Sequence, residues 1–377
     1  MKNFFVFAGE ASGDLYGGRL VAALKNRFQA SSFFGVGGPE LQSQGLTSLI
    51  PIEQFQVMGF SDVYKNLPRL IKNFISLKKA CLKQNPDACI FIDQPAFSIR
   101  FARALRKAGY TGKIIQAVAP TVWAYKPQRA AIMAKYFDLL LPLFSFEVPY
   151  FTHYKVPTIW TGHPLIEYLQ PPTQNDKDKN IISIFPGSRP SEVVANLPMQ
   201  LEGVCQFAAT RPGYSIAISV HSETVRQWIE KEAKNANKKF NLQINLTPFA
   251  ERHDLMRQSC MAVAKSGTVT LELALSEVPT IVTYHLSPLN RFIAKHFLHL
   301  NLPYYCIVNI LKGKELFKEY IEHRPLPEDI AQTLSQLQND AAAIRKECRS
   351  LRSELTTSKE PNRVPSKVAA DAIVSIL

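Results

Sequence analysis

The fold predicted from this sequence rests on two short stretches, Pro186-Gly187-Ser188-Arg189 and Ser266-Gly267-Thr268-Val269-Thr270-Leu271-Glu272. They follow the apolar runs Ile181–Phe185 and Met261–Ala264. Each run has the length of a buried strand, and each turn of small residues leads into a helical pattern. The two stretches therefore predict strand–turn–helix units, from which α/β folds with parallel sheets are built.

Both turns have the composition of an anion site. Turns of Ser, Gly and Thr leave backbone N–H groups unblocked at a helix N-terminus, where the dipole favours negative charge. Arg189 can grip a phosphate with two parallel hydrogen bonds, and Glu272 can accept from a pair of sugar hydroxyls. We therefore expect a nucleotide diphosphate site without a P-loop lysine or a metal-binding acidic pair, formed by Ser188, Arg189, Ser266, Gly267, Thr268 and Glu272.

Length and composition favour a two-domain globular protein. A chain of 377 residues can form two well-buried cores. No apolar run approaches the ~20 residues of a membrane span, and the short run after Met1 is better explained as a first strand than as a signal peptide. The six cysteines lack C-x-x-C spacing, which disfavours metal and disulfide frameworks and fits a reducing cytoplasm.

The net charge of +13 predicts an anionic partner, with improved solubility as the alternative explanation. A nucleic acid is disfavoured, because no helix-turn-helix, zinc-finger or RNP pattern occurs. An acidic membrane face and a phosphorylated substrate remain as candidates for the anionic partner.

Apolar runs alternate with helical patterns on both sides of a polar break at 169–180. We predict an N-terminal Rossmann-like domain at 1–168 and a C-terminal one at 181–360, facing each other across a cleft. A final helix at about 364–377 is compatible with packing back on the first domain. The strands expected in the first half are Phe4–Ala8, Phe33–Val36, Ala88–Ile92, Lys113–Val118, Leu139–Leu141 and Thr158–Trp160.

The first domain offers polar groups at two strand ends. Gly9-Glu10-Ala11-Ser12-Gly13-Asp14 can bring Glu10 and Ser12 close to a polar ligand, although an ordinary strand-to-helix turn explains the pattern as well. Asp93, at the end of a buried run, can act as a general base. The alternative is that Asp93 caps the helix that follows.

His163, in Thr161-Gly162-His163-Pro164, closes the first half, where it would face the cleft. A histidine satisfied by backbone groups is the alternative. The other histidines lack the spacing of metal ligands, so we expect no metal site.

The stretch Pro68–Lys83 is a basic amphipathic pattern that suits a membrane surface. The alternative is a helix that packs on its own domain with a solvated lysine face. The apolar residues expected at the surface are Val57, Met58, Phe60, Leu70, Ile71 and Phe74, and the basic ones are Arg69, Lys72, Lys78, Lys79 and Lys83.

Taken together, the motifs resemble those of the lipid-A-disaccharide synthases, glycosyltransferases of the GT-B fold. The resemblance covers nearly the whole chain and rests on the order of its motifs. These are Gly9–Asp14, Gly35–Pro39, Val57–Phe60, Ile92–Pro95, Val122–Ala124, Val156-Pro157, Gly162–Pro164, Pro186–Arg189 with Glu192-Val193, Ser266–Thr268 with Leu271-Glu272, and Asn309 before Gly313–Leu316.

The resemblance implies that UDP-2,3-diacylglucosamine donates its sugar, with inversion, to 2,3-diacylglucosamine 1-phosphate. It implies Asp93 and Arg189 as catalytic residues, Asn309 at the donor site, and no cofactor or metal. It also implies work at the cytoplasmic face of the inner membrane and is compatible with a homodimer. Departures from the usual motifs are Ala96, Ser98, Ala119, Tyr125 and Cys306-Ile307-Val308.

Two other classes of function compete with this interpretation. Another GT-B enzyme, such as an N-acetylglucosaminyl transferase or a UDP-N-acetylglucosamine 2-epimerase, would share the nucleotide site. The former typically opens with a G-G-T-G-G-H loop, which Gly9–Asp14 does not match. A non-catalytic protein that binds lipid or nucleotide would bind without releasing UDP.

Overall fold

The computed structural model describes residues 1–55, 59–124, 126–173, 180–284, 302–321, 325–357 and 363–377, without the side chains of 59–65. The chain forms two compact units. The N-terminal unit contains residues 1–164 and 355–377, and the C-terminal unit contains residues 165–354.

The N-terminal unit is built on a six-stranded parallel sheet of order β3-β2-β1-β4-β5-β6. Its strands are β1 (Lys2–Ala8), β2 (Ser31–Val36), β3 (Leu46–Ser48), β4 (Ala88–Ile92), β5 (Lys113–Ala117) and β6 (Leu139–Leu141). Its helices are α1 (Ala11–Arg27), α2 (Pro39–Ser43), α3 (Gly59–Gln84), α4 (Pro95–Lys107), α5 (Gln128–Tyr136), α6 (Val148–Thr152) and α15 (Pro365–Val374), with short 3₁₀ turns η1 (Ile52–Gln54) and η2 (Ser145–Glu147).

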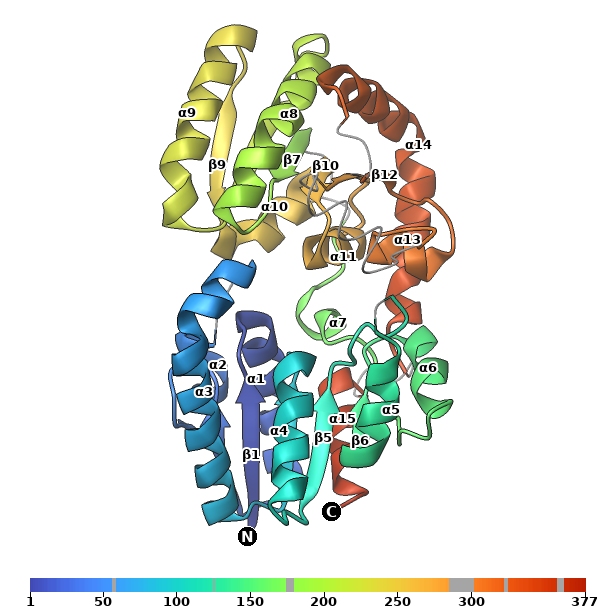
Figure 1. Cartoon of the computed structure of the whole chain (residues 1–377). Helices are drawn as coiled ribbons and strands as arrows, with labels where there is room; N and C mark the ends of the chain where they lie inside the picture. The colour runs from blue at the N-terminus through green and yellow to red at the C-terminus, as the bar shows by residue number, and fades with distance from the viewer. Residues whose placement is uncertain (56–58, 125, 174–179, 285–301, 322–324, 358–362) are drawn as a thin grey trace. The chain divides into compact units, whose positions relative to one another are not determined.

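Alternate residues of β1 face different helices, as strand geometry requires. Phe5 and Phe7 join a core with α3, α4, α5 and α6, whereas Phe4 and Val6 join a second core with α1, α2 and α15. In Figure 1 the red α15 accordingly lies among the blue and green elements of this unit. Both faces of the sheet are covered, which explains the near-continuous apolar strands.

The segment Thr158–Trp160, which we expected to be a strand, makes a single bridge between Thr158 and Leu140. Its only pairing lies at the edge strand β6, so the sheet does not extend further there.

The C-terminal unit has a second six-stranded parallel sheet, of order β12-β11-β10-β7-β8-β9. Its strands are β7 (Ile181–Phe185), β8 (Ser215–Val220), β9 (Ile244–Pro248), β10 (Ser259–Lys265), β11 (Thr280–Thr283) and β12 (Lys318–Tyr320). Its helices include α7 (Leu165–Tyr168), α8 (Pro190–Ala209), α9 (Glu223–Phe240), η4 (Phe249–Glu251), α10 (Arg252–Gln258), α11 (Thr268–Leu275), α13 (Ile307–Lys312) and α14 (Pro327–Glu354).

Each sheet reverses its strand order once, between β1 and β4 in the first and between β7 and β10 in the second. At such a switch point the two following helices leave on opposite faces, which opens a crevice beyond the carboxyl ends of the strands. The turns that follow β7 and β10 are Pro186–Arg189 and Ser266–Thr268.

Helix α3 presents two faces in its described part. Leu77 and Cys81 are buried in the core, and Leu70 and Phe74 pack partly buried against it. We had expected Leu70 and Phe74 at the apolar surface, but the helical period turns them toward the sheet. Val57 and Met58, and the side chain of Phe60, lie outside the described residues.

The other face of α3 carries an exposed apolar stripe. Leu67, Ile71 and Ile75 are 43%, 51% and 56% exposed and recur every four residues. Arg69, Lys72, Lys79 and Lys83 are also exposed on this helix. No helix in the described part of the chain is long and apolar enough to cross a membrane.

Asp14, in the first turn of α1, has a structural role. Its buried carboxylate accepts hydrogen bonds from the N–H groups of Gly38, Glu40 and Leu41 at 2.7, 3.0 and 3.1 Å. These N–H groups belong to the first turn of α2, so Asp14 ties α1 to the N-terminus of α2.

Replacing Asp14 by Ala should lower the free energy of unfolding by about 3 kcal/mol, because it leaves buried N–H groups without an acceptor. Asp371→Ala is the matched control, since it removes an exposed ion pair with Arg27 and should cost less than about 1 kcal/mol. Urea unfolding followed by circular dichroism measures both. Equal shifts in the two variants would contradict the structural role of Asp14.

Candidate active site

Asp93 lies at the switch point of the N-terminal sheet, directly after β4. Asp93 and Gln94 both adopt left-handed backbone conformations, with φ of 57° and 47°. The buried side chain of Gln116 on β5 donates to the Asp93 carbonyl at 3.0 Å, and the Asp93 N–H donates to the Ala117 carbonyl at 2.9 Å. The neighbouring strand therefore holds a strained turn in place, as is common at functional sites.

The Asp93 carboxyl group has the environment of a base. Burial raises its pKa, and the negative charge of Glu10 raises the pKa further, against a lowering by the Gln94 backbone. A carboxylate with a raised pKa accepts a proton more readily than an ordinary Asp does.

Glu10 and Ser12 stand at the same switch point and are exposed. Gly9, just before them, packs so closely on the Gln94 side chain that a Cβ would lie 2.4 Å from its Oε1 atom. The ends of β1 and β4 are thus in contact, and Glu10, Ser12 and Asp93 share one edge of the sheet.

His163 is buried, at 6% exposure. Its backbone N–H donates to the Leu355 carbonyl at 2.8 Å, and its imidazole ring packs on Phe144 with 5.2 Å between ring centroids. Gly162 beside it has φ of 83° and leaves only 2.8 Å between a Cβ and that same carbonyl. The motif therefore seats the returning C-terminal segment on the N-terminal unit, and an acceptor-site role for His163 stays a prediction.

In the C-terminal unit, the turn Pro186–Arg189 differs from our expectation of open N–H groups. The Glu192 carboxylate accepts hydrogen bonds from Ser188 N–H and Arg189 N–H at 3.3 and 3.4 Å. Glu192 stands three residues after the N-cap, the position of the acidic member of a capping box. An internal carboxylate thus occupies the N-terminus of α8.

The Arg189 side chain remains available at this turn. It is 56% exposed, and its one contact with a described side chain is a long one, 3.3 Å from Nη1 to Glu192 Oε1, for a group with five donors. Arg189 can therefore turn toward a phosphate and still stay beside the end of β7.

The second turn, Ser266–Thr268, is open. Ser266 N–H continues the sheet by donating to the Thr283 carbonyl at 2.9 Å, but Gly267 and Thr268 are exposed. Helix α11 begins at Thr268, and the first N–H groups of a helix have no acceptor within it. This turn suits an anion better than the turn at 186–189 does.

Glu272 on α11 is buried and ionised. Arg252 Nε and Nη2 lie 3.2 and 3.4 Å from its two carboxylate oxygens, and His253 Nε2 lies at 3.8 Å. Burial alone would raise the pKa of Glu272, but His253 and Arg252 outweigh it and hold the pKa below its ordinary value. A carboxylate has about four acceptor positions, so those contacts do not use all of them, and a role in binding sugar hydroxyls stays a prediction.

Asn309, expected at the donor site, is fully buried on α13. Its Nδ2 donates to the Phe317 carbonyl at 2.7 Å and to Glu319 Oε1 at 2.6 Å, and its Oδ1 accepts from Phe317 N–H at 2.8 Å. Glu319 in turn accepts from Tyr305 N–H and Cys306 N–H. Asn309 therefore supports the start of α13, and direct contact with a donor stays a prediction.

Three charged residues at the second site had no role predicted from the sequence: Glu192, Lys265 and Arg252. Only Glu192 had a usable signal, namely its capping-box spacing from Arg189. Lys265 and Arg252 had none, because their partners Glu192 and Glu272 lie far away in sequence.

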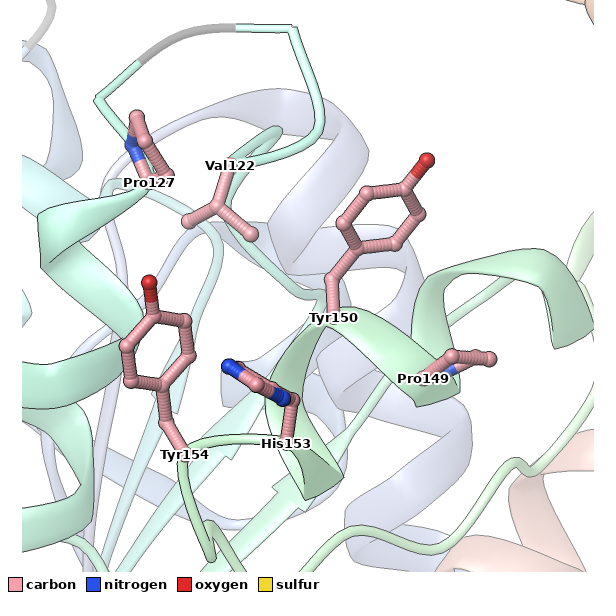
Figure 2. Close-up of a pocket in the computed structure, with 6 residues that line it drawn as sticks. All are labelled: Val122, Pro127, Pro149, Tyr150, His153 and Tyr154. Carbon is pink, nitrogen blue, oxygen red and sulfur yellow. The ribbon is translucent and has the colours of Figure 1, made fainter.

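A pocket of about 330 Å³ lies on the N-terminal unit, between the segment after β5 and helix α6. Figure 2 shows two tyrosine side chains with the ring of His153 between them, opposite Val122 and Pro127. None of the site residues predicted from the sequence lines it. Its walls are Val122, Pro127, Pro149, Tyr150, His153 and Tyr154.

Among the described residues, no three His, Cys, Asp or Glu side chains gather as metal ligands would. The charged side chains of the C-terminal site pair with one another, as in Arg252–Glu272 and Lys265–Glu192. The groups that could bind an anion at this site are thus cationic side chains and backbone N–H groups.

Comparison with solved structures identifies the fold. Acinetobacter baumannii MurG superposes with a TM-score of 0.61 at 15% identity, over 100% of both chains. Two Rossmann-like units with parallel six-stranded sheets, together with this likeness, show a GT-B fold.

Comparison of sequences identifies the family. The chain is 36% identical to the lipid-A-disaccharide synthase of Chlamydia pneumoniae over 94% of its own length but spans 60% of that relative. It is 33% identical to the lipid-A-disaccharide synthase of Rhodospirillum centenum, over 99% of this chain and 94% of the relative. The family model described as lipid-A-disaccharide synthetase matches residues 4–373. The chain therefore belongs to the lipid-A-disaccharide synthetase family.

Proposed function

We propose that the protein transfers 2,3-diacylglucosamine from its UDP derivative to the 6-hydroxyl of 2,3-diacylglucosamine 1-phosphate, forming a β(1→6) disaccharide 1-phosphate and UDP. The family and its two relatives support this reaction. We also propose that the enzyme acts at the cytoplasmic face of an anionic membrane and that it is active as a homodimer.

One observation carries the proposal: the two switch points hold complementary chemistry. The first has a carboxyl group with a raised pKa at Asp93, and the second has an open turn beside Arg189 and a buried ionised Glu272. A base for an acceptor and an anion site for a leaving group are what sugar transfer from a nucleotide requires.

The reaction follows from these groups. Asp93 takes the proton of the acceptor 6-hydroxyl while that oxygen attacks C1 of the donor sugar from the face opposite UDP. The bond from C1 to the diphosphate oxygen breaks with its electron pair, so configuration inverts and UDP leaves. Arg189 and the N–H groups at Ser266–Thr268 stabilise the charge that grows on the diphosphate.

UDP release measured with donor alone, with acceptor alone and with both tests the function. We expect release only with both substrates, and the same rate in EDTA, since Arg189 and backbone N–H groups replace a metal in this proposal. Release with donor alone would favour a 2-epimerase-like reaction. Loss of activity in EDTA that Mg²⁺ restores would contradict the metal-free mechanism.

Asp93→Asn should lower turnover by ~10²–10⁴-fold with little change in UDP affinity, because it keeps the size of the side chain and removes the base. Glu10→Gln should move the acidic limb of the pH–rate profile to lower pH, since the Glu10 charge raises the pKa of Asp93. Glu40→Gln, at another exposed carboxylate, is the control and should leave the limb in place. An Asp93→Asn enzyme that keeps more than about a tenth of the wild-type turnover would exclude Asp93 as the base.

Membrane association through α3 is supported by its exposed stripe. Both proposed substrates carry acyl chains, and exposed apolar side chains beside lysines suit an anionic bilayer surface. Each basic residue near such a surface contributes about 1 kcal/mol, screened by salt.

Ile71→Ser with Ile75→Ser should weaken binding to anionic phospholipid vesicles about tenfold, because both side chains are exposed and available to the bilayer. The matched control is Ile132→Ser with Ile159→Ser, two aliphatics that are each 39% exposed elsewhere on the N-terminal unit. Replacing Lys72, Lys78 and Lys79 by Glu should also weaken binding and leave UDP affinity unchanged. Sedimentation equal to wild type in both test variants would show that α3 is a packed helix with a solvated face.

A further inference from the structure

Glu192 stands between two cations at the switch point of the C-terminal sheet. Its Oε1 atom lies 3.3 Å from Arg189 Nη1 and 3.2 Å from Lys265 Nζ. Its Oε2 atom accepts the two N–H groups of Ser188 and Arg189 described above. One carboxylate therefore links the turn after β7 to the end of β10.

Lys265 has a defined position beside the open turn. It ends β10 and directly precedes Ser266, and its side chain is only 17% exposed. Its ammonium group lies 4.6 Å from the centre of the Tyr284 ring, on the segment that follows β11. An aromatic face and a carboxylate together hold the charge at this strand end.

We propose that Lys265 is a second cation for the donor diphosphate and that Glu192 is its resident counter-anion, which the diphosphate replaces as a partner. This inference rests on the proposed function only in taking the ligand to be a nucleoside diphosphate. It adds two residues to a site at which the sequence predicted Arg189 as the only cation.

Charge and geometry support the exchange of partners. The four contacts of the Glu192 carboxylate with described residues are 3.2–3.4 Å long, beyond the usual length of charge-assisted hydrogen bonds. Lys265, Arg189 and Glu192 sum to a single positive charge. A diphosphate at Ser266–Thr268 would attract both cations and repel Glu192, since charges in a partly buried site are poorly screened.

The two variants should then have opposite effects on diphosphate affinity. Lys265→Met removes an attracting charge and should weaken UDP binding about tenfold or more. Glu192→Gln removes a repelling charge but keeps a side-chain oxygen for the Ser188 and Arg189 N–H groups. It should tighten UDP binding severalfold, most clearly at low salt.

Isothermal titration with UDP, UMP and uridine measures these effects. The changes should be largest for UDP, smaller for UMP and absent for uridine, whose unchanged affinity also shows that each variant is folded. Lys239→Met and Glu202→Gln are matched controls, because they remove the same charges from a surface ion pair between α9 and α8. Both should leave UDP affinity unchanged.

The proposal is overturned if Lys265→Met binds UDP as wild type does, if Glu192→Gln binds UDP equally or more weakly, or if wild-type protein does not bind UDP. An equal loss of uridine affinity in either variant would assign that residue a purely structural role and overturn the proposal too. A wild-type protein that binds UDP but does not transfer the sugar would contradict the proposed function and leave this inference standing.

Discussion

The fold depends on the burial of both faces of two parallel sheets. Strands such as β1 and β4 carry apolar side chains on both faces, and their backbone N–H and C=O groups are hydrogen-bonded within the sheet. Chemistry is thereby confined to the strand ends, and the reversal of strand order selects which ends open into a crevice. This one constraint places Asp93 after β4 and Ser266–Thr268 after β10.

The two switch points treat a buried carboxyl group in opposite ways. Among the described residues, no cation shifts the pKa of Asp93, so burial and the charge of Glu10 raise it. Glu272 is buried more deeply, yet Arg252 and His253 keep its pKa below the ordinary value. The same functional group thus has a raised pKa in one unit and a lowered pKa in the other, because the partners and not the burial differ.

The fold could be predicted because its signals are local. Runs such as Ala88–Ile92 and Ile181–Phe185 became β4 and β7 with the same bounds, since length and apolarity suffice to mark a buried strand. Side-chain partners could not be predicted in this way. Glu192 pairs with Lys265 across 73 residues, and Asn309 turns inward because Glu319 and Phe317 saturate its amide.

The turn at 186–189 is capped by a glutamate and the turn at 266–268 is not, for a reason that their composition cannot show. Both follow a strand and lead into a helix, but α8 carries a glutamate three residues after its N-cap, whereas the same position of α11 is Thr270. Thr270 donates its hydroxyl hydrogen to the Gly267 carbonyl at 2.7 Å and so leaves the N–H groups of Gly267 and Thr268 without a side-chain cap from that position. A single residue in each first helical turn thus decides whether an internal carboxylate caps the helix N-terminus.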